Sequence, residues 1–277
     1  MTFAITIIKG VLIGVSFLIP GLSGGTMMLI LNVFDDAVHA LNELLHFRAY
    51  RLKYYLVMTL GIGLGILAFA GVIDYLLINF NTLTMSFFLG VILSGLIEID
   101  KQITNKVKSI KSLIPYLIGI LLTAGVYFLP SLTIQVDANL SLQNWIQLII
   151  IGIPISVALI LPGLSTSYLL LVFGLYERTL RAISTLDFMF LLPLIIGILI
   201  GVVLFTTLID SALQNYPNLI YKIIYGLVLG SVYGIVKELG IQSLPEGMIA
   251  IGVAIIGFVC VTRFKKTALK LEEASEM

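Results

Sequence analysis

The chain has 277 residues, of which 59% are hydrophobic and only 11% are charged, and its mean hydropathy is +1.12. Soluble domains carry about 25% charged residues, so this composition excludes an ordinary soluble protein and predicts an all-α polytopic membrane protein. The formal net charge of +1 gives no indication of a nucleic-acid partner.

The first predicted element is a broken helix over residues 9–34. Its two apolar legs, 9–19 and 22–34, are each shorter than the roughly 20 residues that cross about 30 Å of hydrocarbon. The sequence Pro-Gly-Leu-Ser-Gly-Gly-Thr at positions 20–26 separates the two legs. We therefore predict a re-entrant helical hairpin here. Three full transmembrane spans are predicted to follow it, at 54–78, 83–99 and 113–129.

The same pattern returns 142 positions later in the chain. A linker is predicted at 131–144, and Pro-Gly-Leu-Ser-Thr-Ser-Tyr then stands at 162–168 between two further apolar legs. The windows 10–36 and 152–178 share 8 of their 27 residues. The second half is predicted to contain a hairpin at 145–176, spans at 188–209, 219–236 and 248–261, and a cytoplasmic tail at 264–277.

Three crossings in each half reverse the second half relative to the first. Residues 1–130 and 145–263 are thus predicted to be two inverted-topology repeats, each a re-entrant hairpin plus three transmembrane helices. With both termini cytoplasmic, 13 of the 16 basic residues fall on the cytoplasmic side, in agreement with the positive-inside rule. The same distribution of basic residues would arise if both legs of each hairpin crossed the whole membrane. Broken helices at matching positions of two halves favour a transporter with its site at the repeat interface.

The hairpin tips contain the predicted binding residues. A helix that begins at Ser23 leaves backbone N–H groups without helical partners and directs a positive dipole end outward, which suits an anion. Glycines let a ligand approach the backbone, and hydroxyl groups add donors. The candidate substrate-binding residues are Ser23, Gly24, Gly25, Thr26, Ser165, Thr166 and Ser167. In the alternative interpretation, the serines only cap their helices and the glycines only allow close helix packing.

Few charged residues adjoin the apolar segments. Arg178 and Arg181 follow the second hairpin, where a basic pair would attract a phosphate group on the outer face. A salt bridge between Glu177 and Arg181 is the alternative for this segment. Asp35 and Asp36 end the first hairpin. Together with Glu177 they are candidates for coupling transport to protons, and the alternative for the two aspartates is that they only mark the membrane interface. The two histidines lack a metal-ligand spacing, so neither a metal nor a cofactor is predicted.

The paired hairpin motifs, the chain length and the apolar layout resemble the bacterial polyprenyl-phosphate (undecaprenyl-phosphate) transporters, over nearly the whole chain. The resemblance implies a flippase-type carrier in the bacterial plasma membrane. Such a carrier returns undecaprenyl phosphate from the outer to the cytoplasmic leaflet for reuse in cell-wall synthesis, with the phosphate bound at the tips. Family members often have Tyr-Glu after the first hairpin, where this chain has Phe34-Asp35, so the acid is kept with a shorter side chain.

Two alternatives to a lipid carrier come from other functional classes. One is a carrier for a small soluble anion, and the other is an intramembrane polyprenyl-pyrophosphate phosphatase. A phosphatase needs an acid, an arginine and a histidine or serine together at the tips. Neither histidine is near a tip and no Glu or Arg accompanies Ser23, so we predict no catalytic residues and no enzyme. The coupling ion stays open at this stage, as does assembly into a homo-oligomer.

Overall fold

The computed structural model describes residues 3–19, 21–104, 110–129, 141–185 and 187–276. Within these ranges the chain forms helices and no strands, which confirms the predicted all-helical class. In chain order the elements are α1 (Phe3–Ser16), α2 (Gly24–Ile30), α3 (Phe34–Leu45), α4 (Leu52–Asn79), α5 (Asn81–Gln102), the 3-10 helix η1 (Ile110–Leu113), α6 (Ile114–Tyr127), α7 (Leu142–Ile160), α8 (Thr166–Val172), α9 (Tyr176–Thr185), α10 (Phe188–Asn215), α11 (Pro217–Glu238) and α12 (Leu244–Glu276).

Seven helices in the described part of the chain are long and apolar enough to cross a membrane. They are α4, α5, α6 together with η1, α7, α10, α11 and the first part of α12. The predicted multi-pass membrane character is therefore confirmed. The first legs of the two predicted hairpins differ, because α1 has 14 residues whereas α7 has 19. At 1.5 Å per residue only α7 approaches the thickness of the hydrocarbon core.

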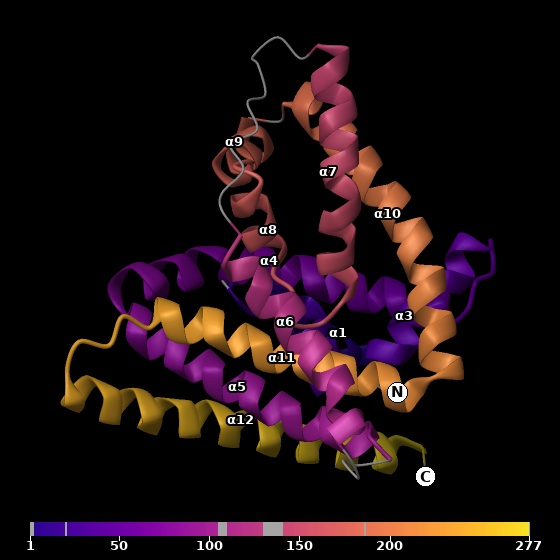
Figure 1. Cartoon of the computed structure of the whole chain (residues 1–277). Coiled ribbons are helices and arrows are strands. Elements are labelled where there is room, and N and C mark those ends of the chain that lie inside the picture. Colours follow the sequence, from indigo (N-terminus) through magenta and orange to yellow (C-terminus); the bar gives the residue numbers. More distant parts are fainter. Residues whose placement is uncertain (1–2, 20, 105–109, 130–140, 186, 277) are drawn as a thin grey trace.

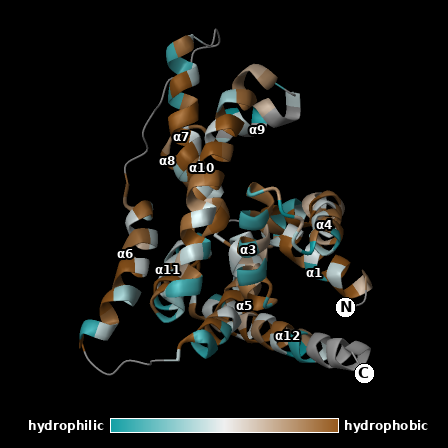
Figure 2. Cartoon of the chain, turned by 90° about the vertical axis from the view of Figure 1, so that its right-hand side faces the viewer, coloured by the Kyte–Doolittle hydropathy of each residue, from teal (hydrophilic) through white to brown (hydrophobic). Residues whose placement is uncertain are grey.

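The long helices form two groups that meet near the middle of the molecule. In Figure 1, α7 and α10 stand upright beside one another, with α8 and α9 on their left. Helices α5, α11 and α12 run across the lower part of the same view, with α1 and α4 also running across behind them. Most of the long helices are coloured as hydrophobic in Figure 2, whereas polar residues gather on short segments and at helix ends. The segments that join α1 to α2 and α7 to α8 lie where the two groups meet.

Glycines allow two pairs of helices to pack at backbone distance. A Cβ atom on Gly61 of α4 would lie 2.5 Å from the carbonyl oxygen of Ile7 in α1. A Cβ atom on Gly197 of α10 would lie 2.1 Å from the carbonyl oxygen of Ile149 in α7. Neither site has room for a side chain, so glycine is required at each. The α1–α4 pair and the α7–α10 pair thus make the same close contact, and Ile7 and Ile149 are 142 positions apart.

Helix lengths recur between the two halves of the chain. Helices α2 and α8 have 7 residues each, α4 and α10 have 28 each, and α5 and α11 have 22 each. Helix α5 packs against α11 near the centre of the molecule, and each of them also packs on a helix from the other half, α5 on α12 and α11 on α6. The fully buried side chains of Ile92, Ile224 and Val228 lie in this central region. The two turns described next pack against the same α5–α11 centre.

Candidate functional site

The Gly-Leu-Ser residues of the two repeated motifs, 21–23 and 163–165, fold into turns of the same shape. Gly21 and Gly163 have φ values of +78° and +87°, a left-handed conformation that glycine adopts without steric cost. Ser23 and Ser165 follow in extended conformation and are the N-cap residues of α2 and α8. The Ser23 hydroxyl oxygen accepts a hydrogen bond from the Gly25 N–H at 3.2 Å. The Ser165 hydroxyl accepts one from the Tyr168 N–H at 3.3 Å, one position further into its helix, so both serines act as helix caps.

Each short helix also ends in the same manner. Asn32 after α2 and Gly174 after α8 are both left-handed, with φ values of 57° and 69°. The N–H of Val33 donates to the Met28 carbonyl at 2.9 Å, and the equivalent bond 142 positions later measures 2.8 Å. This hydrogen bond closes a helix end of the Schellman type. The second leg of each predicted hairpin is therefore a seven-residue helix, a break and a further helix, rather than one continuous helix.

The structure brings the two turns into direct contact. The backbone N–H of Gly163 donates a hydrogen bond to Oγ1 of Thr26 at 3.1 Å, in a buried position. A Cβ atom on Gly25 would lie 3.2 Å from the carbonyl oxygen of Ile160 and 3.2 Å from the Cα atom of Pro162. The sequence-based prediction that the two turns lie near one another is thereby confirmed. Their depth in the bilayer stays a prediction.

The candidate binding residues differ in how far they are enclosed. Ser23, Gly24, Gly25 and Thr26 are all buried, Ser165 and Thr166 are half-buried, and the side chain of Ser167 lies outside the described residues. A Cβ atom on Gly24 would lie 2.3 Å from the ring of Phe17, so this ring covers the first turn. A ligand that reaches the backbone at Gly24 must therefore displace the Phe17 ring.

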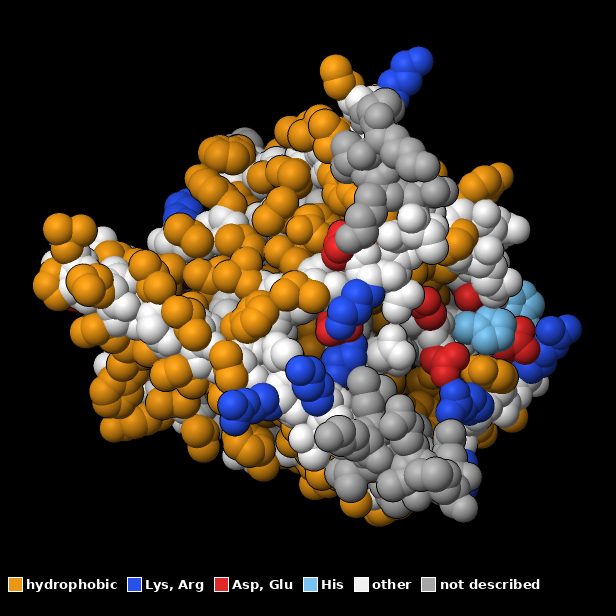
Figure 3. All heavy atoms as spheres, turned by 90° about the horizontal axis from the view of Figure 1, so that it is seen from below, with side chains coloured by type: hydrophobic (Ala, Val, Ile, Leu, Met, Phe, Trp, Pro, Cys, Tyr) orange, Lys and Arg blue, Asp and Glu red, His pale blue; other side chains and the backbone are white. Residues whose placement is uncertain are grey.

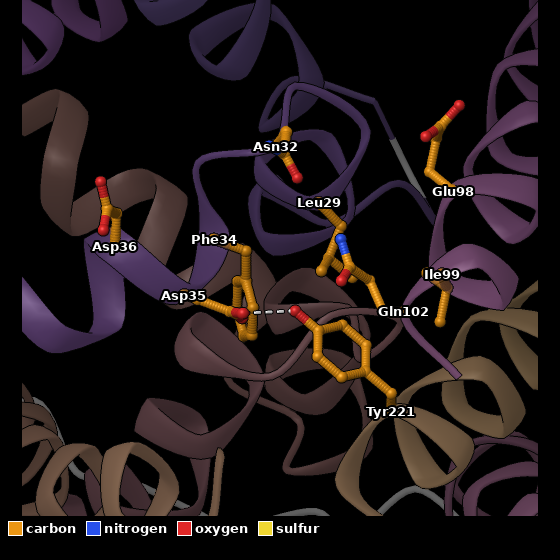
Figure 4. Close-up of a pocket in the computed structure, with 9 residues that line it drawn as sticks. All are labelled: Leu29, Asn32, Phe34, Asp35, Asp36, Glu98, Ile99, Gln102 and Tyr221. Atoms are coloured by element: carbon orange, nitrogen blue, oxygen red, sulfur yellow. Dashed lines mark hydrogen bonds between the residues drawn. The ribbon is translucent and has the colours of Figure 1, made fainter. Parts of the chain in front are cut away.

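The acids after the first hairpin border two cavities. The Tyr221 hydroxyl of α11 donates to the carboxylate of Asp35 at 2.5 Å (Figure 4). Asp35 and Asp36 together line one cavity of about 260 Å³ and another of about 400 Å³. Much of the Asp35 surface is exposed because it faces these cavities, yet the carboxylate beside Tyr221 is partly enclosed. This desolvation raises the pKa of Asp35 above its ordinary 3.8, against the lowering effect of the Tyr221 hydrogen bond, and the charges of Asp36 and Asp210 raise it further.

A polar network that the sequence analysis did not single out surrounds Asp210 of α10. Asp210 is only 4% exposed, and its carboxylate lies 2.7 Å from the Asn42 amide nitrogen and 3.2 Å from Nδ1 of His39. The Gln214 amide donates to the same carboxylate oxygen at 3.1 Å. Acidic and histidine side chains gather in one area of the lower face, with basic side chains around them (Figure 3). The described residues hold no group of three or more His, Cys, Asp or Glu placed to bind a metal ion.

The network was missed because the predicted span ended at residue 209, one position before Asp210. An acid directly after a long apolar run was the available signal, but only the folded chain places α3 against α10.

The two arginines that follow the second hairpin, Arg178 and Arg181, differ in how accessible they are to a ligand. Arg178 donates to the carboxylate of Asp187 at 2.6 Å, and its guanidinium carbon lies 4.8 Å from the ring centre of Phe190. Arg181 lies on the same helix, α9, and is exposed. The side chain of Glu177 lies outside the described residues, so the predicted alternative of a Glu177–Arg181 salt bridge is not tested. A phosphate that binds Arg178 would have to compete with Asp187.

Comparison with known proteins identifies relatives of this chain. The model of a family described as VCA0040-like, undecaprenyl phosphate translocase-like, matches residues 13–246. A Vibrio cholerae protein named polyprenyl-phosphate transporter is 29% identical over 217 residues, which cover 72% of this chain and 68% of the relative. A Staphylococcus aureus protein of the same name is 29% identical over 189 residues, or 65% of each chain, slightly less than two thirds of the relative's length. No solved structure matches the chain.

Proposed function

The chain belongs to the undecaprenyl phosphate translocase-like family, and we propose that it carries undecaprenyl phosphate from the outer to the cytoplasmic leaflet of the bacterial plasma membrane. The lipid would there be reused as a carrier in cell-wall synthesis. Two similar proteins are named polyprenyl-phosphate transporters, which supports a transport role over an enzymatic one. The observation that carries the proposal is the buried hydrogen bond between Gly163 and Thr26, which joins the two repeated turns in an apolar helical protein.

We further propose that the chain is built from two inverted repeats, residues 1–130 and 145–263, joined by the linker 131–144 and followed by a tail. The recurring helix lengths support this division, as do the matching glycine contacts of the α1–α4 and α7–α10 pairs. In this arrangement α1 with α2, and α7 with α8, form the two re-entrant hairpins. Their tips then approach the bilayer centre from opposite sides, and both termini are cytoplasmic.

The proposed phosphate site lies at the paired tips. Its residues are Ser23, Gly24, Gly25, Thr26, Ser165, Thr166 and Ser167. Two short helices that begin at neighbouring points offer backbone N–H groups and hydroxyl donors to one anion. The hydrogen-bonded contact between the turns supports a shared site. The Phe17 ring, which lies against Gly24, would then close this site until a ligand displaces it.

Charged residues have proposed roles at the two ends of the route. Arg178 and Arg181 would capture the lipid phosphate at the outer face, with Arg178 exchanging its Asp187 partner for the phosphate. Asp35, Asp36 and Glu177 are the proposed coupling residues. The raised pKa of Asp35 supports a role in proton binding for that residue.

The test is translocation of undecaprenyl phosphate in vesicles that contain the purified full-length protein. We expect lipid phosphate added to the outer leaflet to become inaccessible to an external phosphatase, at a rate above that of protein-free vesicles. Uptake of soluble phosphate without lipid movement would instead favour a small-anion carrier. Release of inorganic phosphate from polyprenyl pyrophosphate would favour an enzyme, and either result would overturn the proposal.

The site is tested by Gly25→Val with Gly63→Val as its matched control. A valine at position 25 would occupy the space where the ligand must approach the backbone, so transport should fall steeply. A Cβ atom on Gly63 of α4 would have no neighbour within 4 Å, so that variant should transport normally. Rates are compared per folded protein, because valine at position 25 also presses on Ile160 and Pro162. Full transport by Gly25→Val would mean that the first tip does not bind the phosphate.

A further inference from the structure

An apolar groove opens between α3, the start of α4 and the place where α7 meets α10. It encloses about 340 Å³, within the range of about 300–1,000 Å³ that is usual for small-molecule sites. Its walls include Val38 and Leu41 of α3, Met58 of α4, and Ile160 and Val202 from the second half of the chain. The groove is therefore a cavity between the two halves, lined mainly by hydrocarbon side chains.

Two of the side chains that line the groove, Arg48 and Tyr55, are suited to a phosphate group. The side chain of Arg48 is 72% exposed, and its ion pair with Glu43 has a long separation of 3.4 Å. The Tyr55 hydroxyl is buried and has no hydrogen-bond partner among the described residues. A buried hydroxyl without a partner is unfavourable, and an anionic oxygen beside it would accept its hydrogen bond.

The loop between α3 and α4, which contributes Arg48 and Tyr50 to the groove, has the composition of a membrane–water boundary. Phe47 is 99% exposed and Tyr50 is 37% exposed, and Arg51 and Lys53 stand next to them in the chain. Exposed aromatic rings mixed with basic residues are typical of the headgroup level of a bilayer. A lipid held here would have its phosphate at the level that a lipid phosphate normally occupies.

The groove lining also includes residues that adjoin the paired turns. Ile160 and Met28 line the groove, and Met28 belongs to α2, the helix that begins at the first turn. The carbonyl oxygen of Ile160 is the atom that a Cβ on Gly25 would approach to 3.2 Å. The groove lining thus combines residues beside the α3–α4 loop with a residue that adjoins the proposed phosphate site, and most of its walls are apolar.

We propose that this groove is a second binding site for polyprenyl phosphate, with the phosphate between Arg48 and Tyr55 and the first isoprenyl units along the apolar walls. This inference rests on the proposed lipid substrate. The groove would be an additional binding site beside the basic loop between α3 and α4. The lipid would occupy it before or after it passes the two turns. A mainly apolar groove whose lining includes a cation and a hydroxyl matches the hydrocarbon and the charge of a lipid phosphate.

The experiment measures binding of radiolabelled undecaprenyl phosphate to the full-length protein in detergent micelles. Tyr55→Phe removes only the hydroxyl group, and Arg48→Gln removes only the charge. We expect each to weaken binding about tenfold or more, as for the loss of a hydrogen bond to a charged group. Ala37→Phe, which fills the groove, should weaken it further. Lys53→Gln, in the first turn of α4 but outside the groove, should bind as the wild type does.

Melting temperatures without lipid separate a binding defect from a folding defect. Tyr55→Phe should melt at the wild-type temperature or higher, because it removes a buried hydroxyl that has no partner. Unchanged lipid binding in Tyr55→Phe and Arg48→Gln would overturn the groove proposal alone. A wild-type protein that binds no polyprenyl phosphate would overturn the proposed function as well. Equal competition by phosphatidylglycerol would show a general lipid groove and would also overturn the second site.

Discussion

The turn at 21–26 and the turn at 163–168 share a backbone path and differ in what packs against it. A Cβ atom on Gly21 would lie 2.8 Å from Cγ1 of Ile235, which is a side-chain atom. A Cβ atom on Gly163 would lie 2.5 Å from the carbonyl carbon of Leu227, which is backbone. Both neighbours belong to α11, so a single helix supports the two turns in two different ways.

Residues 22–26 of the first turn are buried, whereas the second turn is half-buried at Ser165 and Thr166. The residue three positions after each cap serine differs too. It is Thr26 in the first turn and Tyr168 in the second. Thr26 bonds to the other turn, whereas the Tyr168 hydroxyl donates to the carbonyl of Tyr127 in α6 at 3.2 Å. Repetition of sequence thus repeats local conformation, while each copy acquires its own partners from the rest of the fold.

The largest expected effect comes from alanine at the two turn glycines. A left-handed φ costs a residue with a Cβ atom about 1 to 2 kcal/mol, and Gly21→Ala should destabilise by about that amount because Ile235 can shift. Gly163→Ala adds overpacking against rigid backbone, so we expect about 2 to 5 kcal/mol in total. Chemical unfolding of the purified protein in detergent measures both.

Gly63→Ala is the control for these two variants. Gly63 lies inside α4 with open space around its Cβ position, so alanine there should be neutral or slightly stabilising. Equal losses in Gly21→Ala and Gly163→Ala would contradict the difference between side-chain and backbone support.

The second effect concerns the hydrogen bond between the turns. Thr26→Val keeps the shape of the side chain but leaves the buried N–H of Gly163 without its acceptor, which should cost about 1 to 3 kcal/mol. Thr26→Ser keeps the hydroxyl and loses one methyl group, so about 1 kcal/mol is expected. Tyr168→Phe, at the matching position, should cost about 0.5 to 1.5 kcal/mol, since its bond is only partly buried.

The free energies of unfolding of these three variants, measured relative to the wild type, test the expected losses directly. A Thr26→Val protein as stable as Thr26→Ser would show that the contact between the turns contributes little to the fold.

The sequence predicted the class of fold and the conformation of the turns because both depend on local chemistry. Apolar runs of the right length predict membrane helices, and a repeated Pro-Gly followed by serine predicts a break and a helix cap. The family was also predictable, since the two turn motifs resemble one family over nearly the whole chain, and the family match confirms it.

The breaks after the short helices were not predicted, although Asn32 and Gly174 gave a signal. Both are residue types that tolerate the left-handed conformation, and they occupy matching positions. The Asp210 network and the groove depend instead on α3 packing against α10, a contact between residues more than 160 positions apart. No local pattern contains that information, because it arises only when the two halves pack together.

A smaller effect is expected from the two cap serines. Ser23→Ala and Ser165→Ala each remove a helix cap, at a cost of about 1 kcal/mol. If both tips also bind phosphate, each variant should in addition weaken lipid binding. The melting temperature without lipid reports the cap alone, and the further rise on adding undecaprenyl phosphate reports binding. A normal rise in both variants would leave the serines with the capping role only.

The smallest expected effect is a difference in pH dependence between the segments that follow the two turns. The pKa of Asp35, after the first turn, is raised by partial burial, so the folded protein binds this proton more tightly than the unfolded chain does. Its contribution to stability is therefore complete below the ordinary value of 3.8 and is lost as the pH rises through the higher folded pKa.

The pKa of Asp187, after the second turn, is lowered by the hydrogen bond from Arg178, so its contribution is present above 3.8 and is lost as the pH falls through the lower folded pKa. Melting curves of Asp35→Asn, Asp187→Asn and the wild type between pH 3 and pH 7 measure both effects, and this range is chosen to be about one unit or more on each side of the ordinary carboxyl pKa. We expect Asp35→Asn to gain stability relative to the wild type as the pH rises, and Asp187→Asn to gain relative to it as the pH falls. Parallel curves for all three proteins would show that neither carboxylate is linked to folding, and a shift of the same sign in both variants would contradict the opposite environments of the two segments.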